Sequence, residues 1–151
     1  MDETVREKAP AHLWIVGIVA LLWNGFGAYD YFMTRTRGAA YVESMMPGVD
    51  GNKLMAYIDS FPIWASAGWG LGVWGGLLGA ILLLMRHRLA VPVLGLSLLG
   101  AIVGIGYQLM RPLDVPDMHT GFNAVVPYLI ILIAALLFLY ARGQRAKGVL
   151  R

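Results

Sequence analysis

Four apolar runs divide this sequence, and each is long enough to cross a lipid bilayer as a helix, which takes about 20 residues. They cover roughly residues 13–33, 62–85, 89–110 and 124–141. Charged residues make up only 14% of the chain, whereas a soluble domain carries roughly a quarter. The sequence therefore predicts an all-α fold: an integral membrane four-helix bundle in which residues 1–151 form a single transmembrane domain.

The first run could be mistaken for a cleavable signal peptide, whose apolar core is only about 7–15 residues long. Because the run at 13–33 is longer, we expect it to be retained as a transmembrane helix. The chain contains no cysteine, which excludes disulfides, thiolate metal sites and cysteine nucleophiles. The net charge of +3 is not a nucleic-acid signal, because the basic residues flank the apolar runs as topology determinants do.

These basic residues predict the orientation, because the side of the membrane richer in Lys and Arg normally faces the cytoplasm. The side that holds both termini carries twice as many of them as the other side. We therefore predict that both termini lie in the cytoplasm of a bacterial inner membrane, with the two longer loops outside. The richer side carries Arg6, Lys8, Arg86, Arg88, Arg142, Arg145, Lys147 and Arg151, and the poorer side carries Arg35, Arg37, Lys53 and Arg111.

The first exterior loop contains a helical pattern of its own. Its apolar residues recur with the spacing of one helix face, at Leu54, Tyr57, Ile58 and Phe61. This spacing indicates a short amphipathic helix. We expect it to lie on the membrane surface and to lead into the second span.

Small residues form a stripe along the second span and a weaker one along the third. In lipid, helices associate through close approach at small residues, typically in GxxxG patterns. The pattern is compatible with packing inside one protomer, which we favour, and with contact between protomers. The predicted packing residues are Gly68, Gly72, Gly75, Gly76, Gly79, Gly100 and Gly104. The fourth span contains no glycine, and we expect it to be peripheral and to face lipid.

Asn24 and Asp30 are the polar residues of the first span that most need an explanation, because a polar group in the membrane is costly unless it is partnered. Asp30 lies near the exterior end and could simply pair with Arg35 or Arg37. Asn24 lies deeper and could form an interhelical hydrogen bond. The two residues are about 120° apart around the helix, so we do not expect them to form one cluster.

A candidate polar site can nevertheless be assembled around them if neighbouring helices contribute. Tyr107 and Gln108 of the third span lie at the depth of Asp30. The tryptophans of the spans are expected to pack opposite glycines, with a pocket for a ring-shaped ligand as the alternative. The complete candidate set is Asn24, Asp30, Trp23, Tyr31, Trp74, Tyr107 and Gln108.

The sequence predicts neither a cofactor nor catalysis. None of the three histidines lies within a span, so paired histidine ligands for haem are not indicated. Asp114, Asp117 and His119 occur close together in the second exterior loop, but their irregular spacing is only a weak indication of a metal site. No nucleotide-binding loop or hydrolase motif is present.

Three segments carry a resemblance to a known family: LWNGFGAYDY in the first span, FPIW at the start of the second, and GVWGGLLG within it. In these segments the chain resembles a family of small, functionally uncharacterised four-helix inner-membrane proteins of proteobacteria, some of which are labelled sugar transporters. The resemblance covers most of residues 12–100. It implies a Gram-negative inner membrane, and it directs attention to Trp23, Asn24, Gly27, Asp30, Tyr31, Pro62, Trp64 and Trp74.

These observations predict a non-catalytic membrane protein whose partners are the lipid bilayer and other membrane subunits, or copies of itself. It would act as an accessory or packing subunit of a larger complex or as a homo-oligomer. The alternative is a carrier for a small, sugar-like solute that works as a dimer. Four helices are few for alternating access, which commonly uses two related repeats, and we find no such repeat here.

Overall fold

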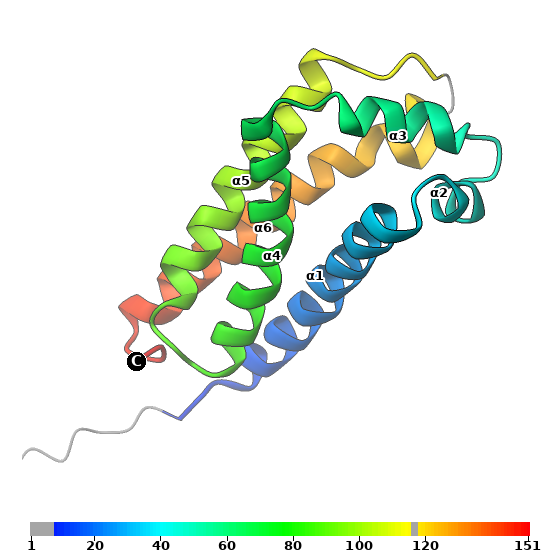
Figure 1. The fold of residues 1–151 in the computed structure, drawn as a ribbon. Helices are drawn as coiled ribbons and strands as arrows, with labels where there is room; N and C mark the ends of the chain where they lie inside the picture. Colours follow the sequence, from blue (N-terminus) through cyan, green and yellow to red (C-terminus); the bar gives the residue numbers. More distant parts are fainter. Residues whose placement is uncertain (1–7, 116–117) are drawn as a thin grey trace, which may run out of the picture.

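The computed structural model describes residues 8–115 and 118–151, and all regular secondary structure in these ranges is α-helical. Four of the helices are long and apolar enough to span a membrane, which confirms an all-α, multi-pass membrane protein. The helices are α1 (Ala11–Arg37), α2 (Ala39–Met45), α3 (Gly51–Asp59), α4 (Ile63–Leu84), α5 (Ala90–Met110) and α6 (Gly121–Ala146). Figure 1 shows the long helices side by side, with α2 and α3 at one end.

Helices α1 and α6 are longer than the apolar runs that predicted them. Helix α1 continues to Arg37 and ends where Gly38 takes a positive φ of 57°, a conformation that glycine adopts without a steric penalty. Helix α6 continues to Ala146, and Gly148 follows with a φ of 71°. Hydropathy marks the stretch that can lie in lipid, whereas these glycines mark where the helices end.

The long helices contact one another mainly in the order α1–α4–α5–α6. Their apolar side chains meet in one cluster that includes Leu13 of α1, Leu83 of α4 and Leu137 of α6. At the same end, a ring nitrogen of His12 and the hydroxyl of Tyr140 lie 2.6 Å apart in a hydrogen bond. Away from this end α1 and α6 do not pack extensively on each other, so the row of helices is not closed into a tight four-way bundle.

Helices α4 and α5 form the tightest pair, because their glycines face each other. A methyl group on Gly100 would lie only 2.6 Å from the amide nitrogen of Gly72 and 2.7 Å from the carbonyl oxygen of Gly68. A methyl group on Gly104 would lie 2.9 Å from the amide nitrogen of Trp69. The backbones therefore approach as closely as small-residue packing in membranes allows.

The rest of the predicted stripe also lies inside the protomer. Gly75 faces Ser97 of α5, and Gly79 faces Leu94 of the same helix. Gly76 differs, since it faces Asn24 of α1 as well as Ser97. Helix α4 thus presents small residues to both of its neighbours.

A second apolar cluster lies at the opposite end and joins α2, α3 and the segment after α5. Its buried members are Val42, Val49, Leu54 and Ile58, and Leu113 packs against them. The amphipathic helix was thus correctly predicted, as α3, and its apolar face packs against the protein. Helix α2 was not predicted. It covers α3 because Gly38 turns the chain back directly after α1.

Helix α6 is the most exposed of the four long helices. Only 6% of its most apolar window is buried inside the protein, compared with 44% for α5. This agrees with the expectation that the fourth span is peripheral. Beyond α6, Val149 and Leu150 are buried, and the amide of Arg88 donates to the carbonyl oxygen of Arg151 at 2.7 Å. The last residues therefore fold back onto the α4–α5 turn.

Candidate functional site

Asn24 lies where α1, α4 and α5 meet. Its side-chain amide donates to the carbonyl oxygen of Ala20, one turn earlier, at 2.9 Å. Its carboxamide occupies the space that a side chain at Gly76 would need. On the other side of this glycine, the Ser97 hydroxyl donates to the carbonyl oxygen of Gly72 at 2.6 Å. Because both polar groups donate to helix carbonyls, they form a polar layer among the helices.

Asp30 faces away from this layer and toward α2. Its carboxylate accepts a hydrogen bond from the hydroxyl of Tyr41, with 2.9 Å between the oxygens. The prediction that Asp30 pairs with Arg35 or Arg37 was therefore wrong. The physical reason is the turn at Gly38, which returns the chain along the C-terminal end of α1 and places Tyr41 beside the carboxylate.

The Tyr41 hydroxyl is a poor acid in this setting. The tyrosine is buried, with 7% of its surface exposed. Burial, followed by the hydrogen bond and the charge of Asp30, raises the pKa of Tyr41 from its ordinary value of 10.0 to about 12. Since both causes favour the protonated phenol, Tyr41 remains a hydrogen-bond donor at physiological pH.

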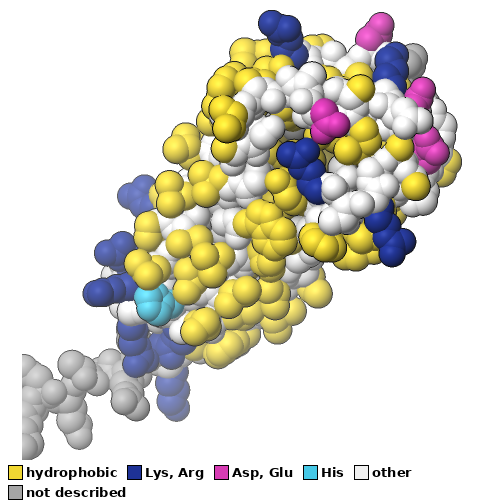
Figure 2. Space-filling model, viewed as in Figure 1, with side chains coloured by type: hydrophobic (Ala, Val, Ile, Leu, Met, Phe, Trp, Pro, Cys, Tyr) yellow, Lys and Arg dark blue, Asp and Glu magenta, His cyan; other side chains and the backbone are white. Residues whose placement is uncertain are grey.

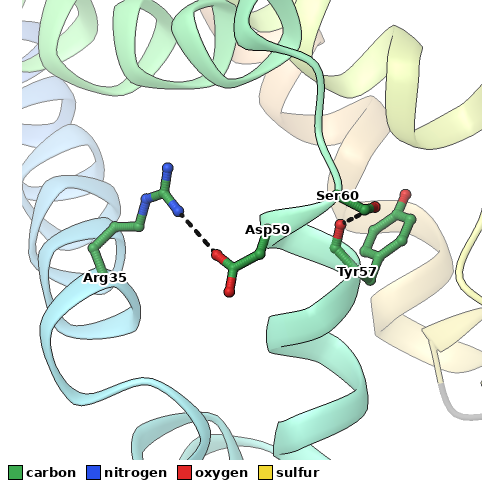
Figure 3. A network of polar contacts seen from close by, with 4 residues as sticks. All are labelled: Arg35, Tyr57, Asp59 and Ser60. Atoms are coloured by element: carbon green, nitrogen blue, oxygen red, sulfur yellow. Dashed lines mark hydrogen bonds and ion pairs between the residues drawn. The ribbon is translucent and has the colours of Figure 1, made fainter.

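Tyr31 is the centre of an aromatic cluster between α1 and α4. Its ring packs edge-on against Trp69, with centroids 4.6 Å apart, and against Trp74, at 6.1 Å. The guanidinium of Arg35 lies 5.7 Å from the Trp69 ring and 6.0 Å from the Tyr31 ring. Arg35 also forms an ion pair with Asp59 at 3.7 Å, and Figure 3 shows this contact bridging α1 and α3.

Tyr107 belongs to a neighbouring aromatic group on the other side of α4. Its ring lies 5.0 Å from Phe61 and 5.4 Å from Trp64. Phe61 in turn contacts Trp69 at 6.5 Å, so the two aromatic groups are continuous. The hydroxyl of Tyr57, whose ring also packs on Phe61, donates to the carbonyl oxygen of Arg111 at 2.6 Å.

The predicted candidate residues are therefore distributed over four places. Asn24 lies in the polar layer, and Asp30 lies against α2. Tyr31 and Trp74 lie in the Arg35 cluster, and Tyr107 lies in the neighbouring aromatic group. Trp23 and Gln108 are half-buried and take part in none of the contacts described above.

The weakly indicated metal site is not assembled by the part of the chain that the structure describes. Asp117 lies outside the described residues. A ring nitrogen of His119 is hydrogen-bonded to the carbonyl oxygen of Leu113 at 2.6 Å. Asp114 is exposed, and its backbone carbonyl accepts from the side chain of Lys53. Across residues 8–115 and 118–151, no three His, Asp or Glu side chains are placed to hold a metal ion.

Three residues that the structure places in contacts between helices or in a buried position were not among the candidate site residues predicted from the sequence. The contact between Arg35 and Tyr31 could have been predicted, because Arg35 follows Tyr31 by four residues and therefore lies on the same face of the helix. The contact of Tyr41 with Asp30 could not have been predicted, because the position of Tyr41 depends on the turn at Gly38. Gln144 is 4% exposed, and its side-chain oxygen is buried without a hydrogen-bond partner. It lies beyond the apolar run predicted at 124–141, whereas α6 continues to Ala146.

The chain matches no protein-family model, no curated protein and no solved structure. The resemblance to small proteobacterial inner-membrane proteins therefore stays a prediction.

Proposed function

We propose that this chain is a multi-pass protein of the bacterial inner membrane, with both termini in the cytoplasm, that carries out no chemistry itself. It acts by contact with other membrane-protein helices, as an accessory subunit of a larger assembly or as a homo-oligomer.

The observation that carries this proposal is an outward-facing notch on α1. Gly25 has nothing within 4 Å of the position where a side chain would begin. Large side chains surround the notch on the exposed face of the helix, including Leu22 and Tyr29. Glycine within a helix costs about 1 kcal/mol relative to alanine, and in lipid this cost is recovered where a second helix packs closely.

The outer helices support the same function. Helix α6 has few buried residues and contacts mainly α5. Helix α1 contacts mainly α4 along its length. A row of helices with two open sides can receive a partner at either α1 or α6, and the notch favours α1.

The test is the native state of the protein after gentle detergent extraction. The wild type should migrate with a partner or as an oligomer. Gly25→Ile should release the protomer while its own thermal stability is kept, because the substitution fills only the outward notch. Leu132→Phe, a change at an exposed position on α6, serves as the control and should leave the assembly intact.

A wild-type protein that runs as a lone, monodisperse protomer would contradict the proposal. So would an assembly that survives Gly25→Ile.

One observation favours the alternative, a carrier for a small sugar-like solute. Tyr31, Trp69 and Trp74 converge next to Gly70, whose side-chain position is 3.4 Å from the Tyr31 hydroxyl. Aromatic rings of this kind can bind ring-shaped ligands. Solute uptake into proteoliposomes that is lost on Asn24→Ala and Asp30→Ala would favour this alternative, and unchanged uptake would contradict it.

A further inference from the structure

A shallow depression lies where the end of α6 meets the beginning of α5. It has a volume of about 520 Å³ and is lined by Val91 of α5 and by Phe138, Arg142, Arg145 and Ala146 of α6. The lining combines apolar side chains with two guanidinium groups. This combination suits a ligand that is anionic at one end and apolar at the other.

The two arginines are available to such a ligand. Both are exposed. The guanidinium of Arg142 lies 5.9 Å from the centre of the Phe138 ring, an arrangement that cation–π attraction stabilises. Arg142 thus lies beside the apolar lining while its side chain stays accessible. A guanidinium can donate two parallel hydrogen bonds to a phosphate.

The surroundings add positive charge. Arg86, Arg88, Lys147 and Arg151 belong to the same end of the molecule, at the α4–α5 turn and just beyond α6. Val91 lies in the first turn of α5, at the end of the helix where its dipole is positive. The Asp and Glu side chains of the described residues lie toward the other end, at Asp30, Glu43, Asp50, Asp59 and Asp114. Figure 2 shows the acidic side chains of the face in view at one end only, whereas basic side chains gather at the other end and also occur among the acidic ones.

The position of the depression relative to the membrane identifies the kind of anion. Leu136 and Leu139 of α6 are more than half exposed and belong to a helix apolar enough to span the membrane. The depression therefore lies at the level where an apolar surface gives way to a basic one, which is the level of lipid headgroups. Basic pockets between transmembrane helices at this level bind anionic headgroups.

We propose that this depression binds the phosphate headgroup of an anionic phospholipid. Arg142 and Arg145 contact the phosphate, and an acyl chain lies along Phe138 and the exposed leucines of α6. The site does not depend on the proposed subunit function, nor on which face of the membrane holds the termini.

The experiment measures retained lipid by native mass spectrometry, after the protein is released from nanodiscs that contain phosphatidylglycerol and phosphatidylcholine. The wild type should retain phosphatidylglycerol selectively. Arg142→Gln with Arg145→Gln should lower this retention about tenfold. Arg88→Gln with Lys147→Gln removes the same charge from the same end but outside the lining, and should change retention less than about twofold.

Ala146→Trp provides a second variant, because it keeps both arginines and fills the depression with an exposed side chain. It should also lower retention severalfold. Excess inorganic phosphate should leave the lipid in place, because free phosphate lacks the acyl chain.

Four results would overturn the proposal. They are equal losses in the two double variants, equal retention of phosphatidylcholine, unchanged retention in Ala146→Trp, and displacement by inorganic phosphate. The last result would assign the site to a soluble anion. Gel filtration and circular dichroism establish that each variant is folded before its lipid is measured.

Discussion

At the scale of single residues, Tyr41 couples the stability of the fold to pH. Its pKa is raised by burial and by Asp30 to about 12 in the folded protein, compared with 10.0 ordinarily. Between these values the unfolded chain loses the phenolic proton while the folded chain keeps it, so stability falls as pH rises. The contribution is complete below pH 10 and is lost as pH passes through about 12.

Tyr41→Phe should therefore flatten the decline in stability above pH 10. It should also cost about 1–2 kcal/mol at neutral pH, because the Asp30 carboxylate loses its hydrogen-bond donor. Unfolding in detergent, followed over alkaline pH, measures both effects. Tyr128→Phe, at an exposed tyrosine of α6, is the control. Identical pH profiles for the wild type and Tyr41→Phe would exclude this role for Tyr41.

A second residue-scale prediction separates the two interactions of Arg35. Its ion pair with Asp59 is long and solvent-exposed, with 67% of the Asp59 side chain accessible, and such pairs contribute at most about 1 kcal/mol. Its contacts with the Trp69 and Tyr31 rings each add about 0.5–1 kcal/mol. Arg35→Ala should thus destabilise the protein more than Asp59→Asn does in equilibrium unfolding. Equal costs would assign the whole effect of Arg35 to the ion pair.

At the scale of elements, the α4–α5 pair depends on glycines that no other residue can replace. A methyl group at Gly100 would overlap backbone atoms of Gly72 and Gly68, which can move only if the helices separate. Gly100→Ala should therefore cost about 1–3 kcal/mol or more. Gly106→Ala, on the same helix with nothing within 4 Å, should instead gain about 0.5–1 kcal/mol. Thermal unfolding in one detergent compares the two, and a loss of similar size in both would refute the packing argument.

How well each element could be predicted from the sequence depends on how local its signal is. Hydropathy predicts the four spans, and the spacing of Leu54 and Ile58 predicts α3. Both patterns lie within the residues of the helix that they predict. Helix α2 and the partner of Asp30 could not be derived, because both depend on the positive φ at Gly38. The convergence of Tyr31 with Trp69 depends on how α1 packs on α4. Helical periodicity predicts the face of the helix on which each aromatic ring lies, but it does not predict which faces of α1 and α4 pack against each other.

At the scale of the whole molecule, the order of helix contacts and the two apolar clusters at opposite ends are tertiary features. The sequence predicted four helices but not the row α1–α4–α5–α6, because glycine stripes mark surfaces of close approach without naming the helix that approaches. The charge asymmetry, in contrast, was readable from the sequence. It persists in the folded protein because the basic α4–α5 turn and the segment after α6 lie together. They are joined by backbone hydrogen bonds from Arg88 to Arg151 and from Arg151 to Arg86.

The same asymmetry leads to a prediction about topology that the absence of cysteine makes simple to test. Single cysteines at Lys8, Asn52 and Lys147 occupy exposed positions before α1, in α3 and after α6. If each long helix crosses the membrane once, Asn52→Cys lies opposite the other two, because one crossing separates it from Lys8 and three separate it from Lys147.

A membrane-impermeant maleimide should label Asn52→Cys in cells whose outer membrane alone is opened. Lys8→Cys and Lys147→Cys should react only after the inner membrane is disrupted, because the basic ends remain in the cytoplasm. The reverse pattern would keep the four crossings and refute the orientation. Labelling of all three from one side would refute the crossings themselves, since three long apolar helices separate Asn52 from Lys147.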